Sequence, residues 1–207
     1  MLQHGVGTIT FYEPETKEFA ALGHGILDVD TRKLIDIGKG ELVTSKIVSI
    51  VKGENGKPGE IKGSIENGTS IGEINKNTFF GIYGKINNSA PLNINTKNAI
   101  EVANRNEIKT GEASILCTLD ESGPQEYKIN IDKIYYNNNT NNKSMLIRVT
   151  DEKLIEKTGG IIQGMSGSPI IQNGKFIGAI THVLVNDSKE GYAVFGDMML
   201  KQMRTTE

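Results

Sequence analysis

The sequence predicts an all-β fold, a sandwich or a barrel with few short helices. Short runs rich in β-branched residues recur along the 207 residues, separated by Gly, Asn and other turn-forming residues. The chain has 24 glycines but only 5 prolines, which suggests tight turns rather than stiff linkers. Many short strands with turns between them are typical of sandwiches and barrels, and a chain of this length can bury a core without disulfides.

The elements follow one another from the N-terminus. Residues 6–12 and 19–27 are expected to form a hairpin around a turn at 13–18. Short helices are expected at 151–157, stopped by a Gly-Gly pair, and at 197–203. The remaining predicted strands are residues 46–51, 60–65, 78–86, 113–119, 127–134, 145–149, 169–171 and 176–185.

Two Asn-rich segments help to organise the chain. Residues 87–98 lie near the middle of the chain and are taken as the connection between two lobes. We therefore expect one domain over 1–207 that divides into lobes at 1–92 and 93–207. The polar run at 137–142 is expected to be a surface loop.

Composition argues against several classes of protein. The net charge of −2 argues against a nucleic-acid-binding surface. The single cysteine, Cys117, excludes an internal disulfide and lies in an apolar run, as a small buried residue would. No apolar stretch approaches the roughly 20 residues that span a bilayer, and residues 1–5 do not resemble a signal peptide. We expect a cytoplasmic protein or a fragment without its targeting segment.

The most informative motif is GMSGSP at residues 164–169, directly before a predicted strand. Flanking glycines allow a tight turn that exposes the hydroxyl of Ser166, and the N–H groups of Gly164 and Ser166 can form an oxyanion hole. The pattern is similar to the nucleophile loop of trypsin-like serine peptidases. A glycine-rich turn without chemistry is the alternative.

A general base is the second requirement. His24, in the segment AALGHG at 20–25, follows the first hairpin and precedes the serine, as in trypsin-like enzymes. His4 lies in a terminus that we expect to fray. His182 is the rival, but its strand follows the serine loop, where Ile180, Thr181 and His182 are expected to line a substrate groove.

The acid that would orient the imidazole is harder to select. Asp151 is a candidate, although an aspartate before a short helix is also a good N-cap. Spacing does not rank the other candidates, which are Asp28, Asp30, Asp120 and Asp132.

Several segments together resemble the peptidase domain of the stage IV sporulation protein B family. They are TGGIIQGMSGSPI at 158–170, IGAITHV at 177–183, GVGTITF at 5–11, ALGH at 21–24 and GIYGK at 81–85. The resemblance spans nearly the whole chain. It implies a two-lobed trypsin-like double β-barrel, with catalytic Ser166 and His24 and with Asp151 as the proposed acid.

The resemblance also implies a biological setting. Family members are secreted across a forespore membrane, cleave themselves, and cleave a membrane-bound regulatory partner, which triggers the proteolytic activation of a late sporulation sigma factor. They usually carry a membrane segment and a PDZ domain before the peptidase domain. We expect this chain, which shows neither, to be a truncated form, a processed product or a shorter relative located outside the forespore membrane.

The sequence therefore leads to one main hypothesis, acyl transfer to Ser166 with His24 as general base and a protein or peptide as substrate. No cofactor or metal is expected, because no ligand cluster has usable spacing. The alternatives are a non-catalytic β domain of the same family that grips a peptide, and an unrelated β domain with accidental motifs. The oligomeric state is not predicted.

Overall fold

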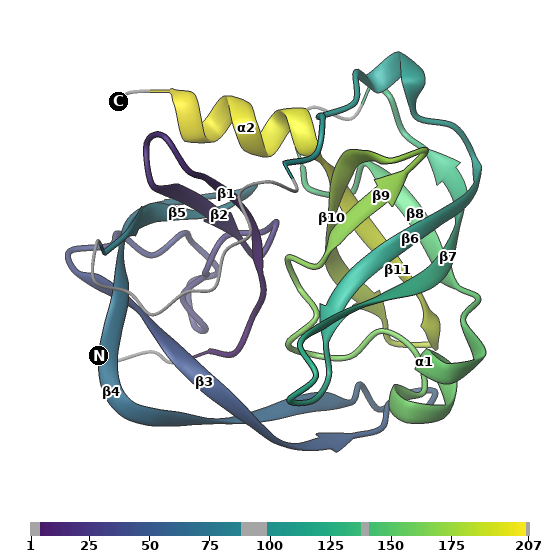
Figure 1. Ribbon diagram of the computed structural model, residues 1–207. Coiled ribbons are helices and arrows are strands. Elements are labelled where there is room, and N and C mark those ends of the chain that lie inside the picture. Colours follow the sequence, from purple (N-terminus) through teal and green to yellow (C-terminus); the bar gives the residue numbers. More distant parts are fainter. Residues whose placement is uncertain (1–4, 88–98, 138–140, 206–207) are drawn as a thin grey trace.

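Two lobes lie side by side in the computed structural model, which describes residues 5–87, 99–137 and 141–205 (Figure 1). The N-terminal lobe is a five-stranded sheet in the order β1-β2-β5-β4-β3, and the C-terminal lobe is a closed barrel in the order β10-β11-β8-β7-β6-β9. The predicted all-β, two-lobed fold is confirmed, with the N-terminal lobe forming a half-barrel. The predicted lobe boundary between residues 92 and 93 lies outside the described residues.

The N-terminal lobe contains a short hairpin and a long one. The short hairpin joins β1 (Ile9–Glu13) to β2 (Glu18–Ala21), and β2 pairs with β5 (Gly81–Ile86). The long hairpin joins β3 (Gly40–Val51) to β4 (Glu60–Thr78). The predicted strands at 46–51 and 60–65 are thus only the far ends of these two longer strands.

The C-terminal barrel is built from antiparallel pairs throughout. Its last strand was not predicted from the sequence, and it is held in place by pairing with β8 on one side and β10 on the other. The six strands are β6 (Gly111–Thr118), β7 (Pro124–Ile134), β8 (Met145–Val149), β9 (Pro169–Gln172), β10 (Lys175–Leu184) and β11 (Asp187–Phe195).

Both predicted helices are present, as α1 (Glu152–Thr158) and α2 (Gly196–Arg204). The described residues also contain a 3-10 turn at Arg105–Glu107. Gly159 ends α1 in the left-handed conformation, with φ of 75°, as a C-terminal glycine commonly does. Helix α2 lies across the top of both lobes (Figure 1) and contacts β2 and β10. No helix in the described ranges is long and apolar enough to cross a membrane.

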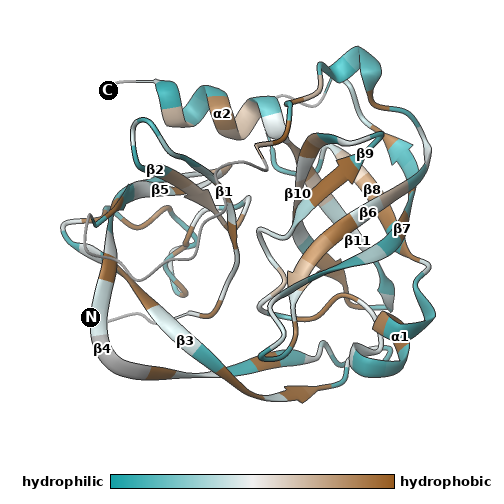
Figure 2. Cartoon of the chain, viewed as in Figure 1, coloured by the Kyte–Doolittle hydropathy of each residue, from teal (hydrophilic) through white to brown (hydrophobic). Residues whose placement is uncertain are grey.

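The main core fills the C-terminal barrel, whose strands carry most of the apolar colour in Figure 2. Alternate residues of β6, β7 and β8 point inward, and Ile115, Ile131 and Ile147 are completely buried. A smaller cluster around Phe19 and Ile82 supports the N-terminal sheet. The closed, packed barrel therefore supports the loops at its rim.

Cys117 faces this core and is 2% exposed. Burial raises the pKa of its thiol to about 12, so almost no reactive thiolate is present near neutral pH. We expect the folded chain to resist Ellman's reagent at about pH 8 and to react fully in guanidinium chloride. Rapid reaction without denaturant would contradict this placement.

Candidate active site

The loop that carries Ser166 is hydrogen-bonded to both lobes. Thr8 N donates a hydrogen bond to Ser166 O at 3.0 Å, and Gly167 N donates to Ile180 O at 2.8 Å. Gly167 has φ of 95°, and a methyl group added there would lie 2.2 Å from Thr8 O. Only glycine fits at this contact, so the backbone of the serine loop is fixed against the start of β1 and against β10.

The hydroxyl of Ser166 donates to Thr181 O at 3.0 Å. The carbonyl oxygens of Ile180 and Thr181 both accept hydrogen bonds from the serine loop. In a regular strand the carbonyls of neighbouring residues point to opposite sides, so this arrangement requires an irregularity. The β10–β11 register shifts between Ile180 and His182, so a bulge at Thr181 explains the arrangement. Two of the predicted groove residues, Ile180 and Thr181, thus contact the serine loop.

The segment that carries His24 contacts the same two elements. Leu22 N donates to Thr8 O at 3.2 Å, and a methyl group on Gly23 would lie 3.1 Å from Thr181 Cγ2. Leu22 and Gly23 both adopt positive φ, 71° and 69°, which turns the chain sharply after β2. The fold therefore brings the beginning of the chain to the serine loop, and His24 is half-buried there.

His24 lies against His182, with 5.1 Å between ring centroids. Its Nδ1 is 3.0 Å from Gly25 O, so a proton on Nδ1 leaves the lone pair of Nε2 free to act as a base. Burial lowers the pKa of His24, and the hydrogen bond to Gly25 partly offsets this. The pKa of His182 falls to about 4, first through burial and then through the charges of His24 and Lys143. Both imidazoles are therefore neutral near pH 7.

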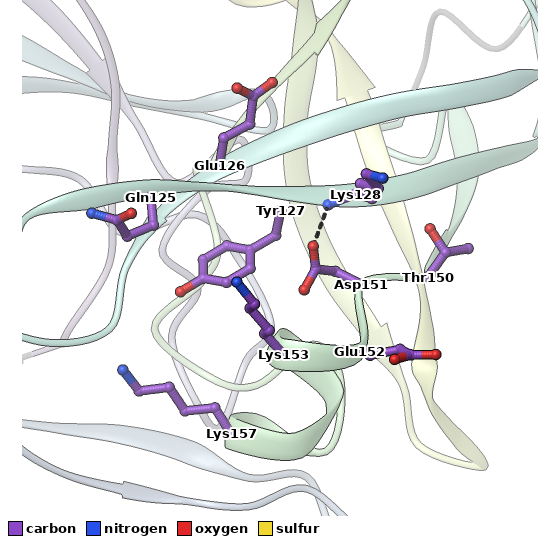
Figure 3. A pocket seen from close by; sticks show the side chains of 9 residues that line it. All are labelled: Gln125, Glu126, Tyr127, Lys128, Thr150, Asp151, Glu152, Lys153 and Lys157. Atoms are coloured by element: carbon purple, nitrogen blue, oxygen red, sulfur yellow. Dashed lines mark hydrogen bonds between the residues drawn. The ribbon is translucent and has the colours of Figure 1, made fainter.

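Asp151 forms the N-cap of α1. Its Oδ1 accepts from Leu154 N at 3.1 Å, and its Oδ2 accepts from Lys128 N at 3.2 Å. Figure 3 shows the second bond, in an open depression that Tyr127 and Lys153 also line. Among the described residues, neither carboxylate oxygen is hydrogen-bonded to an imidazole, so these contacts support the capping role that the sequence also allowed.

The other aspartates that the sequence offered have local roles or lie in solvent. Asp28 accepts from Thr31, Asp120 binds Lys157 and Ser122, and Asp132 binds Arg148. Asp30 is exposed. Among the described residues, the hydrogen-bond partner of His24 Nδ1 is the carbonyl of Gly25.

The two N–H groups expected to form an oxyanion hole are available. Neither Gly164 N nor Ser166 N has an acceptor among the described residues, and both residues are partly exposed. The intervening Met165 is buried and its N–H donates to Ile162 O at 3.1 Å. Gly164, at φ of 99°, is further fixed by a hydrogen bond from Thr8 Oγ1 to its carbonyl at 3.1 Å.

No sequence pattern indicates a role for Thr8 in the site, although this residue lies within the segment 5–11 that resembles the family. Its spacing from Ser166 gave no signal, since 158 residues separate the two. No group of three or more His, Cys, Asp or Glu side chains within the described ranges is placed to hold a metal.

The sequence matches the family described as SpoIVB peptidase S55 over residues 2–200. No match was found among curated proteins. Solved structures similar to the chain include the Rv3671c protease from M. tuberculosis in its active form, with 14% identity, a TM-score of 0.45, and coverage of 100% of this chain and 94% of that one. The HtrA-type protease AlgW with a decapeptide is 14% identical, with a TM-score of 0.46 and coverage of 75% and 50%.

The depressed pKa of His182 predicts a pH-dependent stability. The unfolded chain takes up a proton near the ordinary pKa of 6.5, whereas the folded chain resists protonation down to about 4. The free energy of unfolding should therefore fall as the pH drops through this window. Denaturant titrations at about pH 7 and about pH 5 should show a smaller fall for His182→Gln than for the wild type; equal falls would rule out this assignment.

Proposed function

The chain belongs to the SpoIVB peptidase S55 family and is a serine peptidase, and we propose that Ser166 is its nucleophile and His24 its general base. One observation carries the proposal. The serine loop and the histidine segment, although 142 positions apart in the sequence, are held against the same two elements, the start of β1 and the bulge of β10.

The proposed reaction is acyl transfer. His24 Nε2 takes the proton of Ser166 Oγ as this oxygen attacks the carbonyl carbon of a peptide bond, and general base help of this kind contributes about 10²–10⁴ in rate. The imidazolium then returns the proton to the departing amine. Water, deprotonated by His24, then attacks the acyl-enzyme; the bond to Ser166 Oγ breaks, this oxygen regains the proton from the imidazolium, and the new carboxyl end is released. To start this sequence, the hydroxyl must turn from Thr181 O toward His24.

The charge that develops on the carbonyl oxygen needs donors. Gly164 N and Ser166 N have no acceptor among the described residues, so they can receive an oxyanion without first breaking another bond. One such donor is worth about 10²–10³ in rate. A site that already holds its donors in place reorganises little during the reaction.

An extended peptide is the proposed substrate. On the side away from β11, β10 pairs with β9 as far as Ala179, and Ile180 is then bonded to the serine loop through Gly167 N and Ser168 O. Among the described residues, no strand lies beside Thr181 and His182 on that side. A substrate backbone can add to this side as an extra strand. The carbonyl of Thr181 then serves as an acceptor for a substrate N–H in place of the Ser166 hydroxyl.

The proposed biological role rests on family membership. We propose that the substrate is the chain itself or a membrane-bound regulator of sporulation, and that the enzyme works outside the forespore membrane. The family description supports the link to sporulation. The rival is a domain that grips a peptide along β10 without cleaving it.

A fluorophosphonate probe tests the two central residues. We expect the wild-type chain to be labelled, Ser166→Ala to be unlabelled, and His24→Ala to react about 10²–10⁴ times more slowly. Ser49→Ala, an exposed serine on β3, serves as the matched control and should react like the wild type. Failure of a folded wild-type chain to react would favour the binding domain.

The role of Asp151 stays a prediction that Asp151→Asn can decide. Asparagine caps a helix about as well as aspartate does, so the capping contacts favour a turnover close to that of the wild type. An acid that orients His24 would instead make the same change cost roughly 10⁴ in turnover. The rate of fluorophosphonate labelling, compared at equal fractions of folded protein, measures the difference.

A further inference from the structure

The β3–β4 hairpin forms an arm, residues 40–78, that starts in the N-terminal lobe and extends beneath the barrel of the C-terminal lobe toward α1 (Figure 1). Its tip, residues 52–59, is therefore remote from the sheet to which the arm belongs. The tip and the first residues of β4, besides pairing within the hairpin, also contact the C-terminal lobe.

The tip is attached to the C-terminal lobe by backbone hydrogen bonds. Gly53 N donates to Thr158 O at the end of α1, and Gly56 N donates to Val185 O in the β10–β11 turn, both at 2.8 Å. A methyl group on Gly159 would lie 2.2 Å from Gly53 O. The backbones therefore approach more closely than side chains would allow.

Beyond the tip, the arm pairs with the segment that leads to the nucleophile. Gln163 N donates to Gly59 O and Ile61 N donates to Gln163 O, both at 2.8 Å, so Glu60 and Gln163 form a short parallel bridge. This pairing ends one residue before Gly164. The position of Gly164 is thus set from the arm on one side and by Thr8 on the other.

The side chain of Ile61 completes this support. Ile61 is 8% exposed, and a methyl group placed on Gly164 would lie 3.0 Å from Ile61 Cβ and 3.3 Å from its Cγ1 and Cδ1. Glycine has more conformational freedom than any other residue, so a glycine N–H keeps a fixed direction only when its surroundings impose one. Ile61 supplies an apolar wall directly against this glycine.

We propose that Ile61 is a positioning residue of the proposed reaction: it holds the Gly164 peptide so that its N–H points to the oxyanion. The inference rests on the proposed function, because it assigns the arm a task in that same site. Oxyanion donors act only at distances of about 2.7–3.1 Å, and small misplacements in an active site are costly. The N-terminal lobe therefore contributes to the oxyanion hole as well as to the base.

Truncation of Ile61 tests the proposal, with fluorophosphonate labelling of the whole chain as the assay. We expect Ile61→Ala to lower the maximal labelling rate about tenfold, a fraction of the effect of losing one donor outright, with little change in the half-saturating probe concentration. Ile61→Val should give an intermediate loss of about threefold. Val48→Ala removes an aliphatic side chain that is 66% exposed on the same arm and should react like the wild type.

Hydrogen exchange gives a second readout that does not depend on labelling. Peptides covering residues 159–166 should exchange faster in Ile61→Ala than in the wild type, while peptides from β7 should be unchanged. Where the alanine variant does not fold, the valine variant carries both measurements.

The outcomes separate the two proposals. A labelled wild type, with Ile61 variants that label as fast as Val48→Ala, would overturn the positioning role and leave the proposed function intact. A folded wild type that is not labelled would overturn the proposed function and the role of Ile61 with it. A general loss of stability would quicken exchange throughout the barrel and would also count against a specific role.

Discussion

The close approach of two backbones at Gly167 is the constraint on which the site depends. The start of β1 passes so near this residue that no side chain can be inserted, and hydrogen bonds from Thr8 and to Ile180 fix the loop on both sides. Because the carbonyl oxygen of Thr8 also accepts a hydrogen bond from Leu22 N, the same residue positions the segment that carries His24. A single glycine contact thus sets the relation between the proposed base and the proposed nucleophile.

The electrostatics of the site agree with the proposed role of His24 as a general base, because its imidazole is neutral before the reaction. Burial lowers the pKa values of His24 and His182, and a neutral imidazole is the form that can accept the proton of serine. The partner of His24 Nδ1 is a carbonyl rather than a carboxylate. A carbonyl fixes the ring and its tautomer, as an acid would, but stabilises the charged imidazolium less.

Much of the fold could be predicted from the sequence, because local patterns report local structure. The alternation in β6, β7 and β8 and the cap and glycine around α1 are signals of this kind. β11 begins with the polar run DSKEG and has a clear apolar pattern only after Gly191, so tertiary pairing decides its structure. The same holds for β4, the second strand of the arm. Its sequence is rich in Gly and Asn, and its strand structure depends on pairing with β3 and β5. Motifs in the sequence single out Ser166 and His24 as candidate site residues, whereas Thr8 and Ile61 touch the serine loop through long-range contacts that leave no local pattern.

The hydrogen bonds of Ser166 also have a consequence for the order of events during synthesis. Its carbonyl is held by the eighth residue of the chain and its hydroxyl by Thr181, so no N-terminal fragment that stops before β10 contains both partners. A nascent chain that has already exposed the serine outside the ribosome still lacks the strand that holds it. Contacts that span such long sequence separations form late in folding, and the proposed hydrolytic activity can arise only after β10 has been synthesised and has left the ribosome.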